Sequence, residues 1–260
     1  MTLPVEILAF EYPPISHLVE WPDIFFKGSA FAINKVVLGY FLAVIATLAI
    51  FVLAGRKAAL VPSGIQNVAE SSIDFIRNGI VMQTMGPSGL AWVPFLTTLF
   101  FFILFNNMLE LVPGWQMPGT ARMALPAFLA VLVWVLFNVV GIKSQGIGGY
   151  LKSTLFPPGV PPALYLLVTP IEFVSTFLVR PFSLAVRLFA NLLAGHILLV
   201  TFAVLSAALW VGDWYAVFLP LPVVMLIFLF GFELLVSFLQ AYIFTILAAV
   251  YIGGAMHPEH

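Results

Sequence analysis

PFSLAVRLFANLLAGHILLVTFAVLSAALWV, residues 181–211, is an apolar run that is longer than the roughly 20 residues needed to cross a bilayer as a helix. It carries a single arginine, Arg187. A guanidinium keeps its proton in proteins, and insertion scales put an arginine at a membrane helix centre at about +3 kcal/mol. Such a residue is retained where a partner charge or a water-filled cavity meets it. What Arg187 faces is therefore the main functional question.

The composition of the whole chain is that of an integral membrane protein. Of its 260 residues, 62% are hydrophobic and 8% are charged, and few soluble folds can bury so much apolar surface. The net charge of −1 gives no indication of nucleic-acid binding. The absence of cysteine from the sequence excludes disulfides, thiolate metal sites and thiol catalysis. Residues 1–32 contain Glu6 and Glu11 but no basic cluster, so we expect an extramembrane arm and no cleavable signal peptide.

Residues 33–260 are expected to form a single all-α membrane domain with about five transmembrane helices, because several apolar runs reach bilayer length. Apolar residues at helical spacing around Glu70 and Asp74 predict one amphipathic helix, at about 63–82, on the membrane surface. The expected spans are about 36–54, 91–112, 123–142, 163–210 and 222–253.

The last two spans are longer than a bilayer requires. At about 1.5 Å per residue, the excess must be taken up by tilt, breaks or burial in protein. Pro181 is expected to kink a helix that begins near Ala163, and Pro220 and Pro222 to mark the start of the final helix. We therefore expect a long, steeply tilted hairpin that turns near Gly212 and Asp213.

The basic residues of the loops predict the orientation, because they collect on the cytoplasmic side. The side shared by residues 55–90, 142–162 and the C-terminus carries most of them. We therefore expect the N-terminus outside and the C-terminus in the cytoplasm. The basic residues on the expected cytoplasmic side are Arg56, Lys57, Arg77, Lys143 and Lys152.

Helix geometry groups the polar residues of the spans. Ser183, Asn191 and the small Ala190 and Ala194 share a face with Arg187, so another backbone can approach closely beside a hydrated path. Glu233 and Gln240, seven residues apart, lie nearly in register on the final helix. His196 points roughly away from Arg187. Because histidine titrates near neutrality, a pair of His196 and Glu233 across the hairpin would form a proton relay.

Structural roles for the same residues stay open. Arg187 can form an ion pair within this chain, with Glu172 or Glu233, and a contact between His196 and Glu233 can simply lock the hairpin. The other polar residues of the spans also fit helix packing or a helix end at the membrane interface: Asn107, Glu110, Glu172, Ser183, Asn191 and Gln240.

Three motifs resemble subunit a of rotary F-type ATP synthases of the bacterial type, in the order and with the spacing of that family. They are NMLELVP at 107–113, RPFSLAVRLFANLLAGH at 180–196 and LQAYIF at 239–244. The resemblance covers roughly residues 90–260. It implies a membrane stator subunit of a proton-translocating synthase, with two aqueous half-channels that couple proton flow to rotation of the ring of c subunits.

The resemblance also implies roles for single residues. Arg187 matches the family's essential arginine, which faces the acidic residue of the passing rotor subunit. Glu172 and Ser183 lie near the half-channel to the cytoplasm. The half-channel to the outside is matched by Asn107, Glu110, Asn191, His196, Glu233 and Gln240.

The chain departs from the family pattern at Arg122 and at Glu172, and it shows one exchange that some members share. Arg122 follows Ala121 where the family often has an aspartate, so no role is carried over to it. Glu172 is one residue further from Arg187 than its counterpart in some members. His196 and Glu233 are also exchanged relative to some bacterial members, which favours a direct contact between them.

The expected partners are the ring of c subunits, the b/b′ or b–δ peripheral stalk subunits, the lipid bilayer and protons. No nucleic acid, cofactor or metal is expected, and the location is the plasma (inner) membrane of a bacterium. The chain shows no His-Glu-x-x-His, Gly-x-Ser-x-Gly or phosphate-loop pattern, so it is not expected to be an enzyme. The alternative is a stand-alone ion-coupled secondary transporter, a class that usually shows internal repeats.

Overall fold

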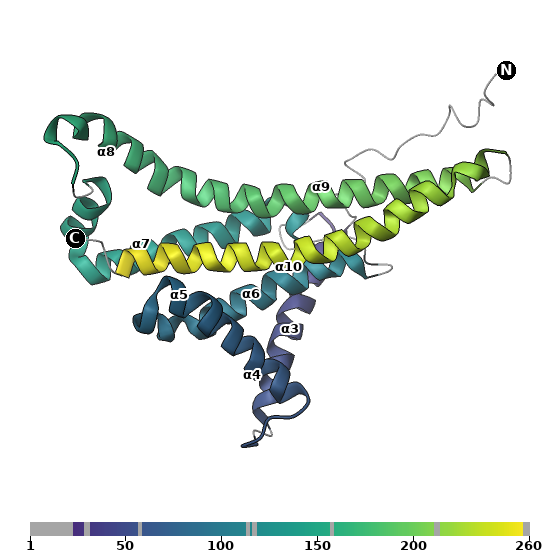
Figure 1. Ribbon diagram of the computed structural model, residues 1–260, viewed down its shortest axis with the longest axis horizontal. Helices are drawn as coiled ribbons and strands as arrows, with labels where there is room; N and C mark the ends of the chain where they lie inside the picture. Colours follow the sequence, from purple (N-terminus) through teal and green to yellow (C-terminus); the bar gives the residue numbers. More distant parts are fainter. Residues whose placement is uncertain are drawn as a thin grey trace.

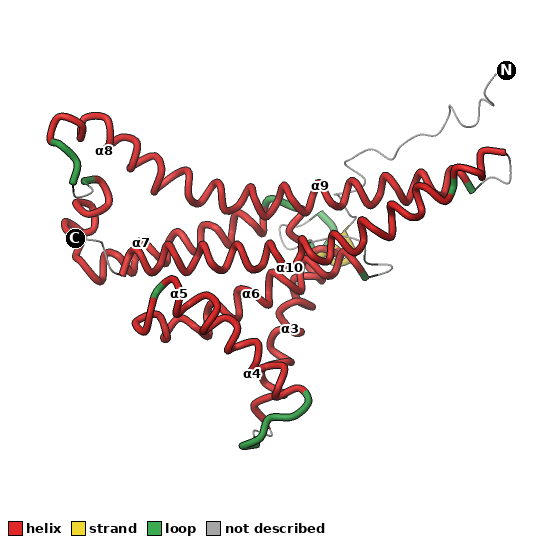
Figure 2. The backbone as a smooth tube through the Cα atoms, in the orientation of Figure 1, coloured by secondary structure: helices red, strands yellow, loops and turns green. Residues whose placement is uncertain are grey.

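The computed structural model describes residues 23–28, 32–56, 59–112, 115, 119–156, 159–210 and 214–256. Most of the expected arm at 1–32 lies outside these ranges. In the described part, helices make up nearly all regular structure (Figure 2), and the strands are one antiparallel pair, β1 (Asp23–Phe25) and β2 (Ile33–Asn34).

Five helical segments of the described chain are long and apolar enough to cross a membrane. This confirms the prediction of an all-α membrane protein with about five spans, of which the last two are long. The first three are α3 (Lys35–Arg56), the series η2 (Gly86–Trp92), α6 (Val93–Met108) and η3 (Leu109–Leu111), and α7 (Ala124–Leu155). The last two are the series η5 (Pro162–Leu164), α8 (Tyr165–Val174), η6 (Ser175–Val179) and α9 (Arg180–Leu209), and the series η7 (Trp214–Phe218) and α10 (Pro220–Met256).

Between the first two spans lie α4 (Ile65–Ile76), η1 (Arg77–Val81) and α5 (Met82–Thr84). One face of α4 is buried, through Gln66, Ala69 and Ile76, and its Glu70 and Asp74 are exposed. This segment occupies the stretch predicted to be amphipathic, and it packs against α3 and α6.

The two final helices lie side by side along the longest axis of the molecule, and α3 runs at a steep angle to them (Figure 1). The 22 residues of α3 match the thickness of a hydrocarbon core, about 30 Å. If α3 runs along the bilayer normal, α9 and α10 are strongly inclined to it, as their length requires. The expected turn at Gly212 and Asp213 lies outside the described residues.

The irregularity expected at Pro181 takes the form of a π-turn directly before it. Proline has no N–H, and its ring clashes with the carbonyl four residues earlier, which here belongs to Phe177. The helix widens over Ser175–Val179, and the Arg180 N–H donates to the Ser175 carbonyl oxygen. The helical path therefore continues from Tyr165 to Leu209.

Helix α7 continues beyond the expected end of the third span, near residue 142, and reaches Leu155 with a break at Gly146. Gly146 has φ 75° and ψ 163°, a conformation that glycine adopts without a Cβ penalty. Just before the break, the Ser144 hydroxyl donates to the Met256 carbonyl oxygen at 3.0 Å. The Gln145 amide donates to the Ala255 carbonyl oxygen at 3.1 Å. The break thus lies where α7 holds the end of α10.

The core forms where α6, α7, α9 and α10 meet. Its fully buried members include Leu96, Ile103, Leu188, Leu192 and Ile252. Small residues of α10, among them Ala241, Ala248 and Ala249, are also buried, and such residues let membrane helices pack closely. Large apolar side chains remain exposed on the outside, as lipid contact requires.

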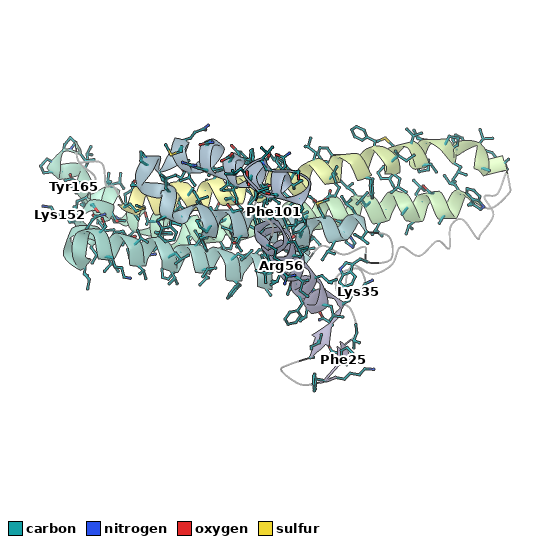
Figure 3. All side chains as sticks on the ribbon, turned by 90° about the horizontal axis from the view of Figure 1, so that it is seen from below. Phe25, Lys35, Arg56, Phe101, Lys152 and Tyr165 are labelled. Carbon is teal, nitrogen blue, oxygen red and sulfur yellow. The ribbon has the colours of Figure 1, made fainter. Side chains whose placement is uncertain are left out.

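Figure 3 shows the two ends of α3, with Lys35 at the end that leads back to Phe25 and Arg56 at the other. The Lys35 ammonium lies 5.6 Å from the centre of the Trp115 ring. The short turn η4 (Gly119–Ala121) packs against α3, α6, α7 and α9. The Lys35 end of α3 is therefore the end near which the connection between the second and third spans is held.

Candidate functional site

A histidine and a glutamate from distant parts of the chain meet in the core. Glu110 lies in η3, the single turn that ends the second span, and His196 lies in the middle of α9. Nδ1 of His196 is 3.1 Å from Oε1 of Glu110, and both residues are 5% exposed. An Nδ1–H donates to the carboxylate, and a protonated carboxyl donating to Nδ1 has the same heavy-atom geometry.

Glu233 of α10 completes the cluster. It is 2% exposed, and its carboxyl group is an electrostatic neighbour of the Glu110 carboxyl group. Its oxygens pack directly on Gly195, where no Cβ stands in the way. The sequence-based pairing of His196 with Glu233 is therefore not the contact found, because the imidazole bonds Glu110. Glu233 lies beside the preceding residue of α9, which only glycine leaves open.

Polar side chains extend this cluster along α6 and α10. The Asn107 amide donates to the Ser237 carbonyl oxygen at 3.3 Å, and the Thr120 hydroxyl donates to Oδ1 of Asn107 at 2.7 Å. Gln240 is buried three residues after Ser237, so Glu233, Ser237 and Gln240 share one face of α10. Asn107, Glu110, His196, Glu233 and Gln240, all predicted for one path, are thus buried in one region.

Several oxygens of this region lack a hydrogen-bond partner. Among the described residues they are Oδ1 of Asn106, Oε2 of Glu110, Oε1 of Glu233 and the hydroxyl of Ser237. Buried polar atoms are normally satisfied by protein groups or by water. A concentration of such atoms in a membrane protein core fits a hydrated interior.

Arg187 lies on a different face of α9. It is exposed, as are Ala190, Asn191 and Ala194, whereas Leu188 and Leu192 of the same turns are buried. In the part of the chain that the structure describes, the Arg187 side chain forms no ion pair and no hydrogen bond, either with Glu172 or Glu233 or with any other side chain. The structural alternative, an ion pair of Arg187 with Glu172 or Glu233, is therefore not observed among the described residues.

Glu172 and Ser183 lie apart from the buried cluster. Both are half-buried, and neither side chain has a hydrogen bond or ion pair within the described ranges. Glu172 precedes Arg187 by 15 positions, which at the usual helical rise is about 22 Å along the axis. The structure therefore does not bring Glu172 to the arginine or to His196.

Sequence reasoning missed three residues of the buried region: Asn106, Thr120 and Ser237. Asn106 and Ser237 interrupt apolar runs, and Ser237 falls one helical turn after Glu233, so helical spacing could have identified both. Nothing in the sequence around Thr120 indicates that a connecting segment is fully buried. No group of histidine, aspartate and glutamate in the described ranges could hold a metal ion.

Fold and site together define a multi-pass α-helical membrane protein with ionisable groups built into its interior. Residues 37–253 match the family described as ATP synthase A chain. This chain belongs to that family, which confirms the resemblance drawn from the motifs.

Similar proteins cover most of the chain. This chain is 44% identical to "ATP synthase subunit a" of Frankia alni over 242 aligned residues. The alignment covers 92% of this chain and 83% of the relative. The protein of the same name from Rhodococcus erythropolis is 42% identical over 242 residues, with 92% and 88% covered. That of a Nocardioides species is 38% identical over 254 residues, with 96% and 92% covered.

Proposed function

We propose that this chain is the proton-conducting stator subunit of a bacterial rotary ATP synthase. In this role it provides two aqueous half-channels and an essential arginine, Arg187, which couple proton flow to rotation of the c-ring. The chain itself performs no nucleotide chemistry, which belongs to other subunits. The observation that carries the proposal is an exposed arginine within a candidate membrane span, which has no partner among the described residues and is separate from the buried acid–imidazole cluster.

The exposure of Arg187 supports a partner outside this chain. A guanidinium facing lipid is costly, so its exposed face calls for a neighbour that supplies a negative charge. The small Ala190 and Ala194 beside it are also exposed and leave room for a second helix. A carboxylate on a rotating ring of c subunits fits both requirements. The arginine favours the ionised carboxylate beside it, and the carboxyl group must be protonated before it crosses lipid.

The buried cluster supports an outward half-channel. Glu110, His196 and Glu233 are groups that bind and release protons, and they lie within reach of one another. Asn107 and Gln240 provide buried polar neighbours, and Asn191 lies on the exposed face of α9 between His196 and Arg187 in sequence. A proton that reaches the cluster can pass towards the rotor-facing surface of α9.

A second half-channel to the cytoplasm runs, in this proposal, past Glu172 and Ser183. Both side chains are half-buried on the helical path before Arg187, on the side remote from His196. Arg187 then separates the two aqueous paths, and a fixed positive charge between them repels protons that would leak directly across. The membrane potential supplies about 2.3 kcal/mol per charge per 100 mV.

We also propose a location, an orientation and partner subunits for this protein. The chain is a multi-pass protein of the bacterial plasma (inner) membrane with its N-terminus outside and its C-terminus in the cytoplasm. It assembles with the c-ring and with peripheral stalk subunits of the b/b′ or b–δ type. Domain limits of 1–32 for the arm and 33–260 for the membrane domain remain part of this proposal.

The test is proton pumping by the whole complex in inverted membrane vesicles. Arg187→Ala should abolish ATP-driven pumping while leaving the amount of assembled complex nearly unchanged. The control is Arg77→Ala, which removes an exposed arginine of η1 and should pump normally. Normal pumping by Arg187→Ala would refute the proposal.

Reconstitution separates the proposal from the transporter alternative. This chain alone in liposomes should not conduct protons, because the ring of c subunits completes the path. Ion transport by the isolated chain would instead favour a self-contained transporter.

A further inference from the structure

A hydrogen-bonded chain runs from the first spanning helix to the last, and η4 is its middle link. The Tyr40 hydroxyl of α3 donates to the Gly119 carbonyl oxygen at 3.0 Å. The next residue, Thr120, donates to Oδ1 of Asn107 on α6 at 2.7 Å. The Asn107 amide donates in turn to the Ser237 carbonyl oxygen of α10 at 3.3 Å. Three spanning helices are thus connected through one turn.

The turn itself is held tightly. All three of its residues are buried, although they belong to a connection between helices. A Cβ added to Gly119 would lie 2.6 Å from Cε1 of Tyr40 and 2.8 Å from Oδ1 of Asn106. Gly119 is therefore clamped between the Tyr40 ring of α3 and a side chain of α6. Arg122, just after the turn, is an electrostatic neighbour of the Tyr40 phenol.

This series of hydrogen bonds ends beside the buried carboxyl groups. Asn107 precedes Glu110 by three residues, and Ser237 follows Glu233 by four, so each lies one helical turn from a carboxyl group on the same face. Because Thr120 occupies Oδ1 of Asn107, the amide nitrogen is directed towards α10. The titratable groups around this end are Glu110 of η3, His196 of α9 and Glu233 of α10.

Resting on the proposed function, we infer that Tyr40 is a positioning residue for proton access to the buried cluster. By holding the Gly119 carbonyl, Tyr40 fixes Thr120 against Asn107, and the fixed amide sets the spacing of α6 and α10 beside the carboxyl groups of Glu110 and Glu233, which receive protons. The first spanning helix therefore takes part in proton uptake on the side of the membrane at which η4 lies.

The test uses the whole synthase in proteoliposomes, with the pH set independently on each side and ATP synthesis driven by an imposed potential. Tyr40→Phe removes one hydroxyl and keeps the ring. It should raise the proton concentration for half-maximal synthesis on the η4 side by about two- to tenfold, the range for one lost hydrogen bond. Half-saturation on the opposite side and the maximal rate should stay nearly unchanged.

The matched control is Thr47→Val on the same helix. Its hydroxyl is buried and, among the described residues, bonds only the Ala43 carbonyl oxygen of its own turn, at 2.8 Å, so its loss should leave both half-saturation values unchanged. Thr120→Val should reproduce the Tyr40→Phe shift, and Thr120→Ser, which keeps the hydroxyl, should not. The double variant Tyr40→Phe/Thr120→Val should shift no further than Thr120→Val alone.

An unchanged half-saturation on the η4 side in both Tyr40→Phe and Thr120→Val, equal shifts on both sides, or additive shifts in the double variant would overturn the inference. If Tyr40→Phe reduces the amount of complex, the two Thr120 variants test the inference: a shift in Thr120→Val but not in Thr120→Ser supports it, and the absence of that difference overturns it. Failure of the proposed function is separately visible, because synthesis would then survive Arg187→Ala. Loss of synthesis in that variant together with an unshifted Tyr40→Phe rejects this inference alone.

Discussion

Glu110 and His196 are 86 residues apart in sequence and hydrogen-bonded in the core, with Nδ1 and Oε1 3.1 Å apart. The contact joins the end of the second span to the middle of α9. Glu233 of α10 lies against Gly195, the residue before this histidine. Three spans therefore contribute one ionisable side chain each to a single buried cluster, and each side chain can be altered separately.

Replacement of Glu110 by glutamine should slow pumping strongly. The amide keeps the size of the side chain but can no longer bind and release a proton, and losing a proton-transfer group typically costs on the order of a hundredfold or more in rate. ATP-driven acidification of inverted vesicles measures the effect. Asp74→Asn is the control, because Asp74 is exposed on α4, and its variant should match the wild-type rate. A wild-type rate for Glu110→Gln would remove this carboxyl group from the proton path.

A double-variant cycle should identify the partner of His196. If the imidazole acts through its bond to Glu110, His196→Gln combined with Glu110→Gln should pump no more slowly than the slower single variant. The combination of His196→Gln with Glu233→Gln should be closer to additive, because directly bonded groups couple most strongly. The same vesicle assay gives all rates. Additive effects for the first pair and non-additive effects for the second would favour the His196–Glu233 contact instead.

A methyl group at residue 195 should disturb the cluster. In Gly195→Ala the new Cβ occupies the place of the Glu233 carboxyl group, so that side chain must move, with a strain of about 1–3 kcal/mol for overpacking. Pumping per assembled complex should fall. Gly55→Ala is the comparison, because a Cβ there meets no atom within 4 Å and alanine favours helix. Equal pumping by both variants would mean that Glu233 need not lie against α9.

Cysteine scanning should reveal the rotor-facing side of α9. The chain has no cysteine of its own, so each introduced thiol is unique in this subunit. Ala194→Cys, on the exposed face of Arg187, should cross-link under oxidising conditions to a cysteine placed beside the rotor carboxylate. Ala185→Cys, which is buried, should not, and gel mobility separates the two results. The reverse pattern would assign the rotor to another face of this chain.

Much of the fold could be predicted from apolar run length alone. The five spans and the excess length of the last two follow directly from runs such as 181–211, because bilayer thickness is a fixed scale. The extension of α7 to Leu155 was not predicted, since the segment after residue 142 is rich in glycine. In this segment the helix continues, and Ser144 and Gln145 donate hydrogen bonds to the end of α10. Tertiary contacts of this kind override local helix propensity.

The site could be predicted as a set of residues but not as a set of contacts. Helical spacing placed Glu233 and Gln240 on one face, and both are buried. It could not show that η3 brings Glu110 to His196, because contacts between distant segments leave no periodic signal in one sequence. The burial of Thr120 could not be predicted for the same reason. Its hydroxyl bonds Asn107 of α6, and the preceding residue, Gly119, accepts a hydrogen bond from Tyr40 of α3.

The π-turn at Ser175–Val179 affects the direction in which side chains before Arg187 point around the helix axis. In an uninterrupted α-helix, one added residue would swing every upstream side chain by about 100° around the axis. A π-turn accommodates one residue more than an α-turn, so it cancels that swing. Glu172 therefore lies at about the same angle around the axis, relative to Arg187, as it would in an α-helix with one residue fewer between them.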